Sequence, residues 1–161
     1  MDLRRLRAGE WVTALGGAAL LVALFLPWYD EGAASPSAWE SFAIVDVILA
    51  LVGLAAVLLL AVTATQSAPA VPIAMDALVT LAGVVAFVLT LVKTATLPGD
   101  ADGRELGLWL GLAASLVVIV GGAFAMRDER RSVAGRNVDL TGRPTAGPPE
   151  IETIPAPRTG Q

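Results

Sequence analysis

Residues 42–62 read FAIVDVILALVGLAAVLLLAV, an apolar run that a single charged side chain, Asp46, interrupts. An α-helix rises about 1.5 Å per residue, so a run of this length can cross the roughly 30 Å of hydrocarbon in a bilayer. Three further apolar runs, at about 11–27, 73–97 and 106–126, meet the same criterion. The sequence therefore predicts an all-α protein, a bundle of four transmembrane helices.

The composition of the whole chain agrees with a membrane protein. Of the 161 residues, 55% are hydrophobic and 16% are charged, and the mean hydropathy is +0.69. Soluble domains carry about 25% charged residues. The net charge of −4, without a basic stripe, argues against a nucleic-acid partner. The chain has no cysteine and no histidine, which excludes disulfides, thiolate nucleophiles, imidazole bases and metal or haem sites built from those residues. We expect no cofactor.

The placement of arginines indicates which ends face the cytoplasm. Arg4, Arg5 and Arg7 precede the first run, and Arg127, Arg130 and Arg131 follow the fourth. The positive-inside rule assigns both groups to the cytoplasm, and an even number of spans brings both ends to one side. The two loops that this topology puts outside are acidic, with Arg104 as their basic residue. We therefore predict a multi-pass protein of the bacterial plasma membrane with both termini cytoplasmic.

The same start also has features of a cleaved signal peptide, with small residues at 32–34. The Trp28-Tyr29 edge and the acidic pair that follows it favour a retained span instead.

We expect three regions: a basic N-terminal segment (1–10), the transmembrane domain (11–126) and a C-terminal tail (127–161). The tail has no aromatic residue and contains five prolines, at positions 144, 148, 149, 155 and 157. Such a segment cannot bury enough apolar surface to offset its ordering entropy, so the sequence predicts a disordered cytoplasmic tail.

Two charged residues within the spans attract attention. Asp46 near the start of the second span and Lys93 near the end of the third are both expected in the outer leaflet, on helix faces rich in small residues. An intramembrane charge is costly and is usually paired, which predicts an Asp46–Lys93 ion pair. The alternative is that Lys93 reaches the outer interface while Asp46 sits on the first helical turn, favoured by the helix dipole. Asp76, near the inner end of its span, is expected to be a first-turn or interface carboxylate of the same kind.

Small residues recur along the fourth span at helical spacing, at Gly107, Gly111, Ser115 and Gly122. In lipid, such a face allows close approach of another helix. It either closes the bundle of one chain or forms a dimer, and packing within one chain is the more common use.

The loop between the first two spans is the other distinctive feature. It carries Trp28, Tyr29, Trp39 and Glu40 near the expected outer membrane surface. These residues could form an aromatic and acidic patch for a lipid headgroup or a protein partner. The simpler interpretation, which we favour, is an aromatic belt that anchors the second helix, with Ser41 as its N-cap.

Catalytic chemistry finds little support. Asp46 and Asp76 fall toward opposite membrane faces, whereas an aspartyl protease needs two adjacent carboxylates. A Ser–Lys dyad of Lys93 with Ser115 or Ser41 lacks any accompanying motif, and no phosphate-binding or dinucleotide fingerprint is present. We expect no enzymatic activity.

The FLPWY stretch (25–29), the SAWESF stretch (37–42) with Asp46 four residues on, and the TQSAPA stretch (65–70) resemble a group of small uncharacterised actinobacterial membrane proteins. The resemblance covers roughly residues 5–128. It implies four spans and residence in a bacterial plasma membrane, and it implies no activity.

The best-supported function is therefore a non-enzymatic structural or accessory role in the membrane, with lipid and itself or another membrane protein as partners. The alternative is a small transporter or lipid-handling protein that uses Asp46 and Lys93.

Overall fold

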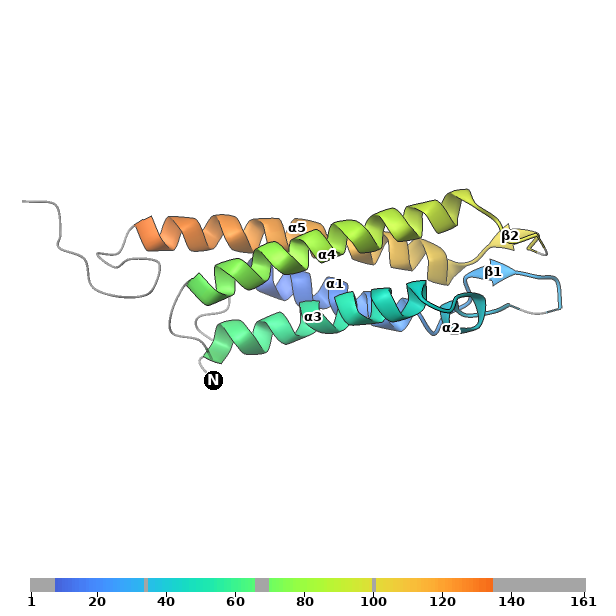
Figure 1. The fold of residues 1–161 in the computed structure, drawn as a ribbon, viewed down its shortest axis with the longest axis horizontal. Coiled ribbons are helices and arrows are strands. Elements are labelled where there is room, and N and C mark those ends of the chain that lie inside the picture. The colour runs from blue at the N-terminus through green and yellow to red at the C-terminus, as the bar shows by residue number, and fades with distance from the viewer. Residues whose placement is uncertain (1–7, 34, 66–69, 100, 135–161) are drawn as a thin grey trace, which may run out of the picture.

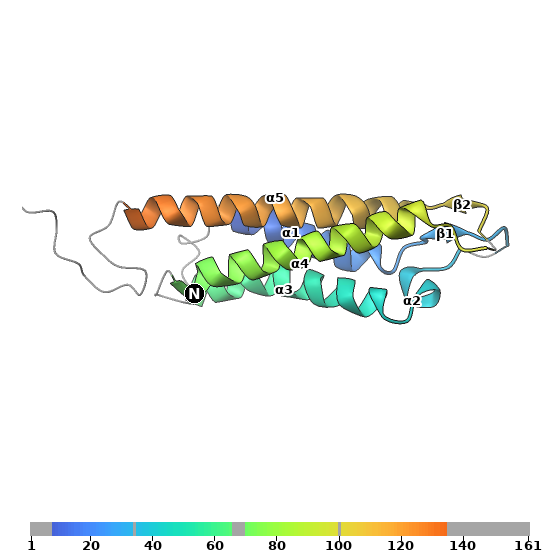
Figure 2. The same cartoon turned by 45° about the horizontal axis from the view of Figure 1, so that its top comes forward.

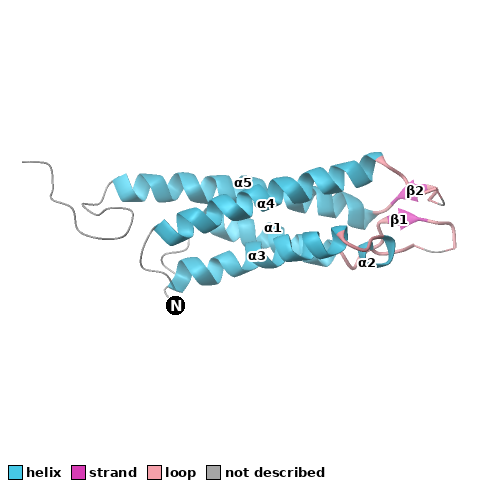
Figure 3. Cartoon of the chain, viewed as in Figure 1, coloured by secondary structure: helices cyan, strands magenta, loops and turns pink. Residues whose placement is uncertain are grey.

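The computed structural model describes residues 8–33, 35–65, 70–99 and 101–134. Within these ranges, four long helices lie side by side (Figures 1 and 2): α1 (Ala8–Ala23), α3 (Val45–Thr65), α4 (Ala70–Ala95) and α5 (Leu106–Ala134). The short helix α2 (Ala38–Ser41) and the strands β1 (Tyr29–Asp30) and β2 (Gly103–Arg104) gather at one end of the bundle (Figure 3). We call this the loop end, and the opposite end the terminus end.

The helices pack in a ring rather than in a row. α1 contacts α5 and α3, α4 contacts α5 and α3, and the α1–α5 contact is the most extensive. Gly9 near the start of α1 packs against Ala125 in α5. The start of the first long helix and the end of the last one therefore lie at the same end of the bundle. The prediction that both ends of the four-helix unit share one side of the bundle agrees with this arrangement.

Three of the four helices are long and apolar enough to cross a membrane: α3, residues 74–95 of α4, and residues 106–127 of α5. α1 is apolar but has 16 residues, or about 24 Å of helix. Main-chain bonds from Phe25 N to Val22 O (3.1 Å) and from Leu26 N to Ala23 O (3.2 Å) continue it by a tight turn before Pro27. The all-α prediction is confirmed, and three of the four predicted spans have the length and composition that crossing a membrane requires.

Much of the outside of the bundle is apolar. Large aliphatic and aromatic side chains are exposed along every long helix, including Leu15, Val22, Leu51, Leu58, Leu78, Leu81, Val88, Leu116, Val120 and Phe124. The buried positions include many small and polar residues, such as Gly17, Gly53, Thr13 and Ser115. A continuous apolar exterior of this kind is suited to lipid and not to water.

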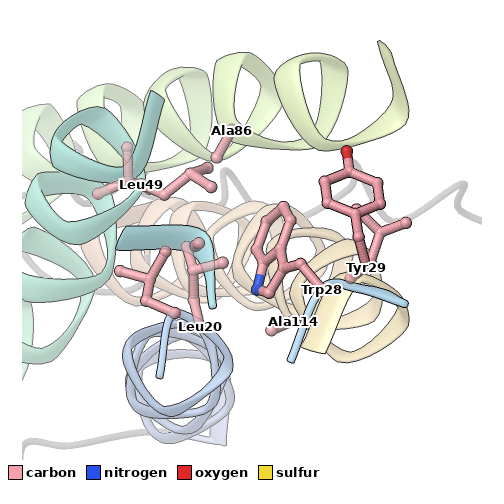
Figure 4. Close-up of a cluster of buried hydrophobic side chains, with 10 residues drawn as sticks. Leu20, Trp28, Tyr29, Leu49, Ala86 and Ala114 are labelled. Atoms are coloured by element: carbon pink, nitrogen blue, oxygen red, sulfur yellow. The ribbon is translucent and has the colours of Figure 1, made fainter. Parts of the chain in front are cut away.

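Two clusters of buried apolar side chains fill the interior. The larger lies toward the loop end and includes Leu20, Leu24, Trp28, Tyr29 and Leu49 (Figure 4). The smaller lies toward the terminus end and consists of Ala56, Leu59, Val79 and Val118. More apolar side chains are therefore buried in the cluster at the loop end than in the cluster at the terminus end.

The observed boundaries differ from the predicted ones mainly at the terminus end. The fourth span was predicted to end at residue 126, but α5 continues to Ala134, so residues 127–134 are helical rather than part of a disordered tail. The rest of the predicted tail, 135–161, and the arginines at positions 4, 5 and 7 lie outside the described residues. α3 and α4 are displaced by up to three residues from the predicted spans, at Val45–Thr65 and Ala70–Ala95.

Candidate functional site

The loop end holds most of the residues that the sequence singles out. Trp28, Tyr29, Phe42 and Lys93, which we call the loop-end cluster, come from three separate parts of the chain and meet there. Trp28 and Tyr29 are fully buried. Neither the exposed patch nor the aromatic belt that we favoured from the sequence describes these two residues, because both rings are buried between the helices (Figure 4).

Trp28 donates a side-chain hydrogen bond to the C-terminal end of α1. Its indole Nε1 donates to the main-chain oxygen of Ala23 at 2.7 Å, a carbonyl at the end of α1 that also accepts from Leu26 N at 3.2 Å. Its ring meets Phe42 edge to face, with the centroids 5.4 Å apart. A pair in this geometry contributes about 0.5–1.5 kcal/mol beyond its buried area.

The side chains of Tyr29 and Arg104 together cap the C-terminal end of α4. The Tyr29 hydroxyl donates to Lys93 O at 3.0 Å, and Arg104 Nε donates to Thr94 O at 2.6 Å. Burial raises the pKa of the Tyr29 phenol above its ordinary value, and the positive charge of Arg104 opposes that rise. Two successive carbonyls of α4 thus receive donors from the β1–β2 pair.

The main chain of residues 27–30 is held from both sides. On one side, Trp28 N donates to Pro36 O at 2.9 Å. On the other, β1 pairs antiparallel with β2, with Tyr29 opposite Arg104, and the pairing is extended by Glu105 N to Trp28 O at 2.9 Å and Gly107 N to Pro27 O at 2.7 Å. Both loops of the loop end are therefore fastened to one another through this segment.

Gly107 and Gly111 provide the space in which Trp28 sits. A Cβ added to Gly107 would lie 2.5 Å from Pro27 O and 2.6 Å from Trp28 Cδ1, and one added to Gly111 would lie 3.1 Å from Trp28 Cζ2. The predicted small-residue face is present, but the half of it nearer the loop end packs mainly against a loop tryptophan.

The half of that face nearer the terminus end packs within the chain as well. Gly122 lies against Thr80 in α4. Ser115 is fully buried, and its hydroxyl donates to Leu112 O at 2.9 Å. These contacts favour packing within one chain, the more common of the two uses weighed from the sequence.

Trp39 and Glu40 differ from Trp28 and Tyr29 because they remain exposed. Trp39 is 40% exposed and lies against Phe25, with ring centroids 6.0 Å apart. The Glu40 carboxylate accepts hydrogen bonds from Ser37 N (2.7 Å) and Ser37 Oγ (2.9 Å), which hold its pKa below the ordinary value. Ser37, and not Ser41, is the N-cap of the first helical element after the loop, α2.

Asp46 and Lys93 have other contacts than the predicted one. Asp46 is buried on the first turn of α3, and its Oδ1 accepts from Val47 N at 2.9 Å. Lys93 Nζ lies 4.4 Å from the centroid of the Phe42 ring. None of the contacts that the structure gives these two described residues joins them to each other. The ring of Phe42 takes the place that the ion-pair prediction gave to the carboxylate.

The terminus end holds two buried acidic residues. We predicted that Asp76 is a first-turn or interface carboxylate, but the structure shows it fully buried. The reason is that α4 begins at Ala70, so Asp76 lies in the second turn of the helix and faces the bundle. Glu10 is 1% exposed, because α1 begins three residues earlier than the predicted span. The one sequence feature of Glu10 that could have pointed to its burial is its position at the edge of an apolar run.

The loop end presents an acidic surface on a rigid base. Glu31, Glu40 and Asp102 are exposed, Asp30 and Glu105 are half-buried, and Arg104 is the exposed basic side chain among them. Among the described residues there is no group of three or more acidic, histidine or cysteine side chains that could hold a metal ion. Comparisons with protein-family models, curated proteins and solved structures found no match to this chain.

Proposed function

We propose that this protein is a non-enzymatic, multi-pass component of the plasma membrane with a structural or accessory role. Its loop end faces outward, and both termini lie in the cytoplasm. Its partners are the lipid bilayer and a membrane protein, either a second copy or a different chain. The apolar exterior and the three helices of spanning length support the membrane location.

One observation carries the structural role: two adjacent aromatic side chains of the loop end, Trp28 and Tyr29, are occupied by internal contacts. Trp28 and Tyr29 are buried, and their polar atoms donate to the ends of α1 and α4. A ligand site needs polar groups that converge on open space. Here the conspicuous groups make the loop end rigid instead, so what remains for a partner is the acidic surface above them.

The distribution of charge supports the outward orientation of the loop end. Acidic side chains predominate there, and Arg127 lies near the terminus end of α5, where the positive-inside rule places basic residues in the cytoplasm. A rigid acidic surface outside the membrane suits a partner with basic groups, because complementary charge favours encounter and fixes orientation.

Affinity capture from native membranes after crosslinking tests this role. We expect the wild-type chain to crosslink to itself or to a small set of membrane proteins, and Glu31→Gln with Asp102→Asn to weaken that crosslink. Ser35→Ala, an uncharged exposed change in the same loop, is the matched control and should leave it intact.

Flux measurements in reconstituted vesicles test the competing function. Transport or lipid transfer that Asp46→Asn or Lys93→Met abolishes, without loss of folding, would replace the structural role with the carrier alternative. Equal behaviour of wild-type and variant vesicles is the result that the structural role requires.

A further inference from the structure

Thr63 differs from the other threonines of the described residues in the hydrogen bonding of its hydroxyl. The hydroxyls of the other six, Thr13, Thr65, Thr80, Thr90, Thr94 and Thr96, each donate to the main-chain carbonyl four residues earlier. This bond is the usual way for a threonine to satisfy its hydroxyl inside an apolar helix. Thr63 Oγ1 is buried and has no hydrogen-bond partner among the described residues.

The position of Thr63 turns this hydroxyl toward the interior of the bundle. The residue is 5% exposed and lies on the buried face of α3, four residues after Leu59 and seven after Ala56. That face packs against α1 and α4. A buried hydroxyl that makes no hydrogen bond destabilises the folded state, so Thr63 Oγ1 is available to a ligand that binds oxygen.

Helix register places Glu10 at the level of Thr63. Gly17 of α1 touches Ala56 of α3, since a Cβ on Gly17 would lie 2.6 Å from Ala56 Cβ. The two helices run in opposite directions, so seven residues back along α1 and seven residues forward along α3 cover the same rise, roughly 10 Å toward the terminus end. Those steps lead to Glu10 and Thr63.

Contacts through α5 place Asp76 close to the same level. Gly121 packs against Thr13, one turn from Glu10, and the neighbouring Gly122 packs against Thr80, one turn from Asp76. Glu10, Thr63 and Asp76, which we call the polar layer, thus come from three helices at one depth of the bundle. All three are more than nine-tenths buried.

We propose that the polar layer binds a small monovalent cation, with the size and oxygen preference of sodium. The layer offers hydroxyl and carboxyl oxygens and no nitrogen or sulfur, which is the ligand set of a hard cation. In a region of low dielectric constant an ionised carboxylate attracts a cation more strongly than it attracts a neutral water molecule. Glu10 and Asp76 have interactions of their own, so Thr63 is the group with unused hydrogen-bonding capacity.

A cation at this point has a structural consequence. The contact between α3 and α4 is the least extensive of the four contacts between neighbouring helices, and the apolar core is light at the terminus end. A bound ion would connect α1, α3 and α4 at the end of the bundle that has the smaller apolar cluster. The site lies at the opposite end from the loop-end cluster and is independent of the role proposed for that cluster.

Thermal unfolding of the full chain in detergent micelles tests the proposal, with sodium chloride replaced by choline chloride at fixed ionic strength. We expect the unfolding temperature to rise with sodium concentration and to saturate, because a ligand that binds only the folded state stabilises it by mass action. Thr63→Val should raise the sodium concentration at half-maximal effect about fivefold or more. Glu10→Gln and Asp76→Asn should do so as well.

Two further variants separate ion binding from a packing effect. Thr63→Ser keeps the hydroxyl and should keep the sodium response. Thr90→Val removes a buried hydroxyl that is already bonded within its own helix, and should change stability equally in both salts. An unfolding temperature of the wild type that does not depend on sodium would overturn the proposal. So would a sodium response that Thr63→Val leaves unchanged, since a water molecule or a packing defect at Thr63 predicts equal losses in sodium and choline.

Discussion

The hydroxyl of Tyr29 donates to the main-chain oxygen of Lys93 at 3.0 Å, across 64 residues of chain. Tyr29 lies in the loop after the first helix, and Lys93 lies near the end of the third long helix. The next residue back, Trp28, makes the equivalent bond to the end of α1. Two adjacent aromatic residues thus terminate two different helices, and this relationship gives the loop end its rigidity.

Tyr29→Phe removes the donor to Lys93 O while keeping the ring in place. We expect a loss of about 1–2 kcal/mol in the free energy of unfolding, because a partly buried carbonyl loses its partner. Denaturant unfolding in mixed micelles measures the change. Trp39→Phe, an exposed aromatic change at the same end, is the control and should fall within about 0.5 kcal/mol of wild type. Similar losses for the two variants would argue against a capping role for Tyr29.

Gly107→Ala should disturb the seat of Trp28. The added methyl group would lie 2.5 Å from Pro27 O and 2.6 Å from Trp28 Cδ1, so the loop must shift, at a cost of about 1–3 kcal/mol. Gly99→Ala is the matched control, since a Cβ there meets nothing within 4 Å. Near-ultraviolet circular dichroism and thermal unfolding should show a loss in the first variant only. An unchanged tryptophan signal in Gly107→Ala would contradict the packing described for Trp28.

Acid should weaken the start of α2. Hydrogen bonds from Ser37 lower the pKa of Glu40 below its ordinary value near 4.5, so the stabilisation is present above that value. It is lost as the pH falls through the lower pKa of the folded state. Trp39 is adjacent in sequence, so its fluorescence should report the change in a chain in which the exposed Trp11 and Trp109 are replaced by phenylalanine and the buried Trp28 is kept. Glu40→Gln should remove the transition, whereas Glu31→Gln should leave it. A transition that survives Glu40→Gln would assign it to another group.

The partner of Lys93 can be decided by double-mutant cycles. Lys93→Met combined with Phe42→Leu should show a coupling energy of about 0.5–1 kcal/mol, the usual value for a cation over an aromatic ring near a surface. Lys93→Met combined with Asp46→Asn should be additive. Coupling between Lys93 and Asp46, with none between Lys93 and Phe42, would restore the ion pair predicted from the sequence.

The parts of the structure that depend on local sequence were predictable. Apolar runs identify the helices because main-chain groups in lipid must be bonded within their own segment, which leaves the helix as the available structure for a chain of this kind. The spacing of Gly107, Gly111, Ser115 and Gly122 likewise identified a buried face of α5. Both signals lie within one helix.

The contacts that join distant segments were not predictable in the same way. Helical rise gave the depth of Asp46 and Lys93, but depth does not determine which neighbours lie beside a side chain, and Phe42 proved to be the neighbour of Lys93. Trp28 and Tyr29 have the composition of an exposed interfacial belt. Their burial follows from pairing between β1 and β2, two strands of two residues each, which no periodicity in so short a segment can reveal.

Labelling of single cysteines in intact cells tests the central claim most directly, and the natural chain has no cysteine to interfere. Glu31→Cys and Asp102→Cys place a thiol at exposed positions of the loop end, and Arg127→Cys places one at an exposed position near the terminus end. With a maleimide that cannot cross membranes, the first two should react in intact cells, and the third only after the membrane is permeabilised. Reaction of Arg127→Cys in intact cells together with either loop-end variant would contradict a bundle that crosses the bilayer with its loop end outside.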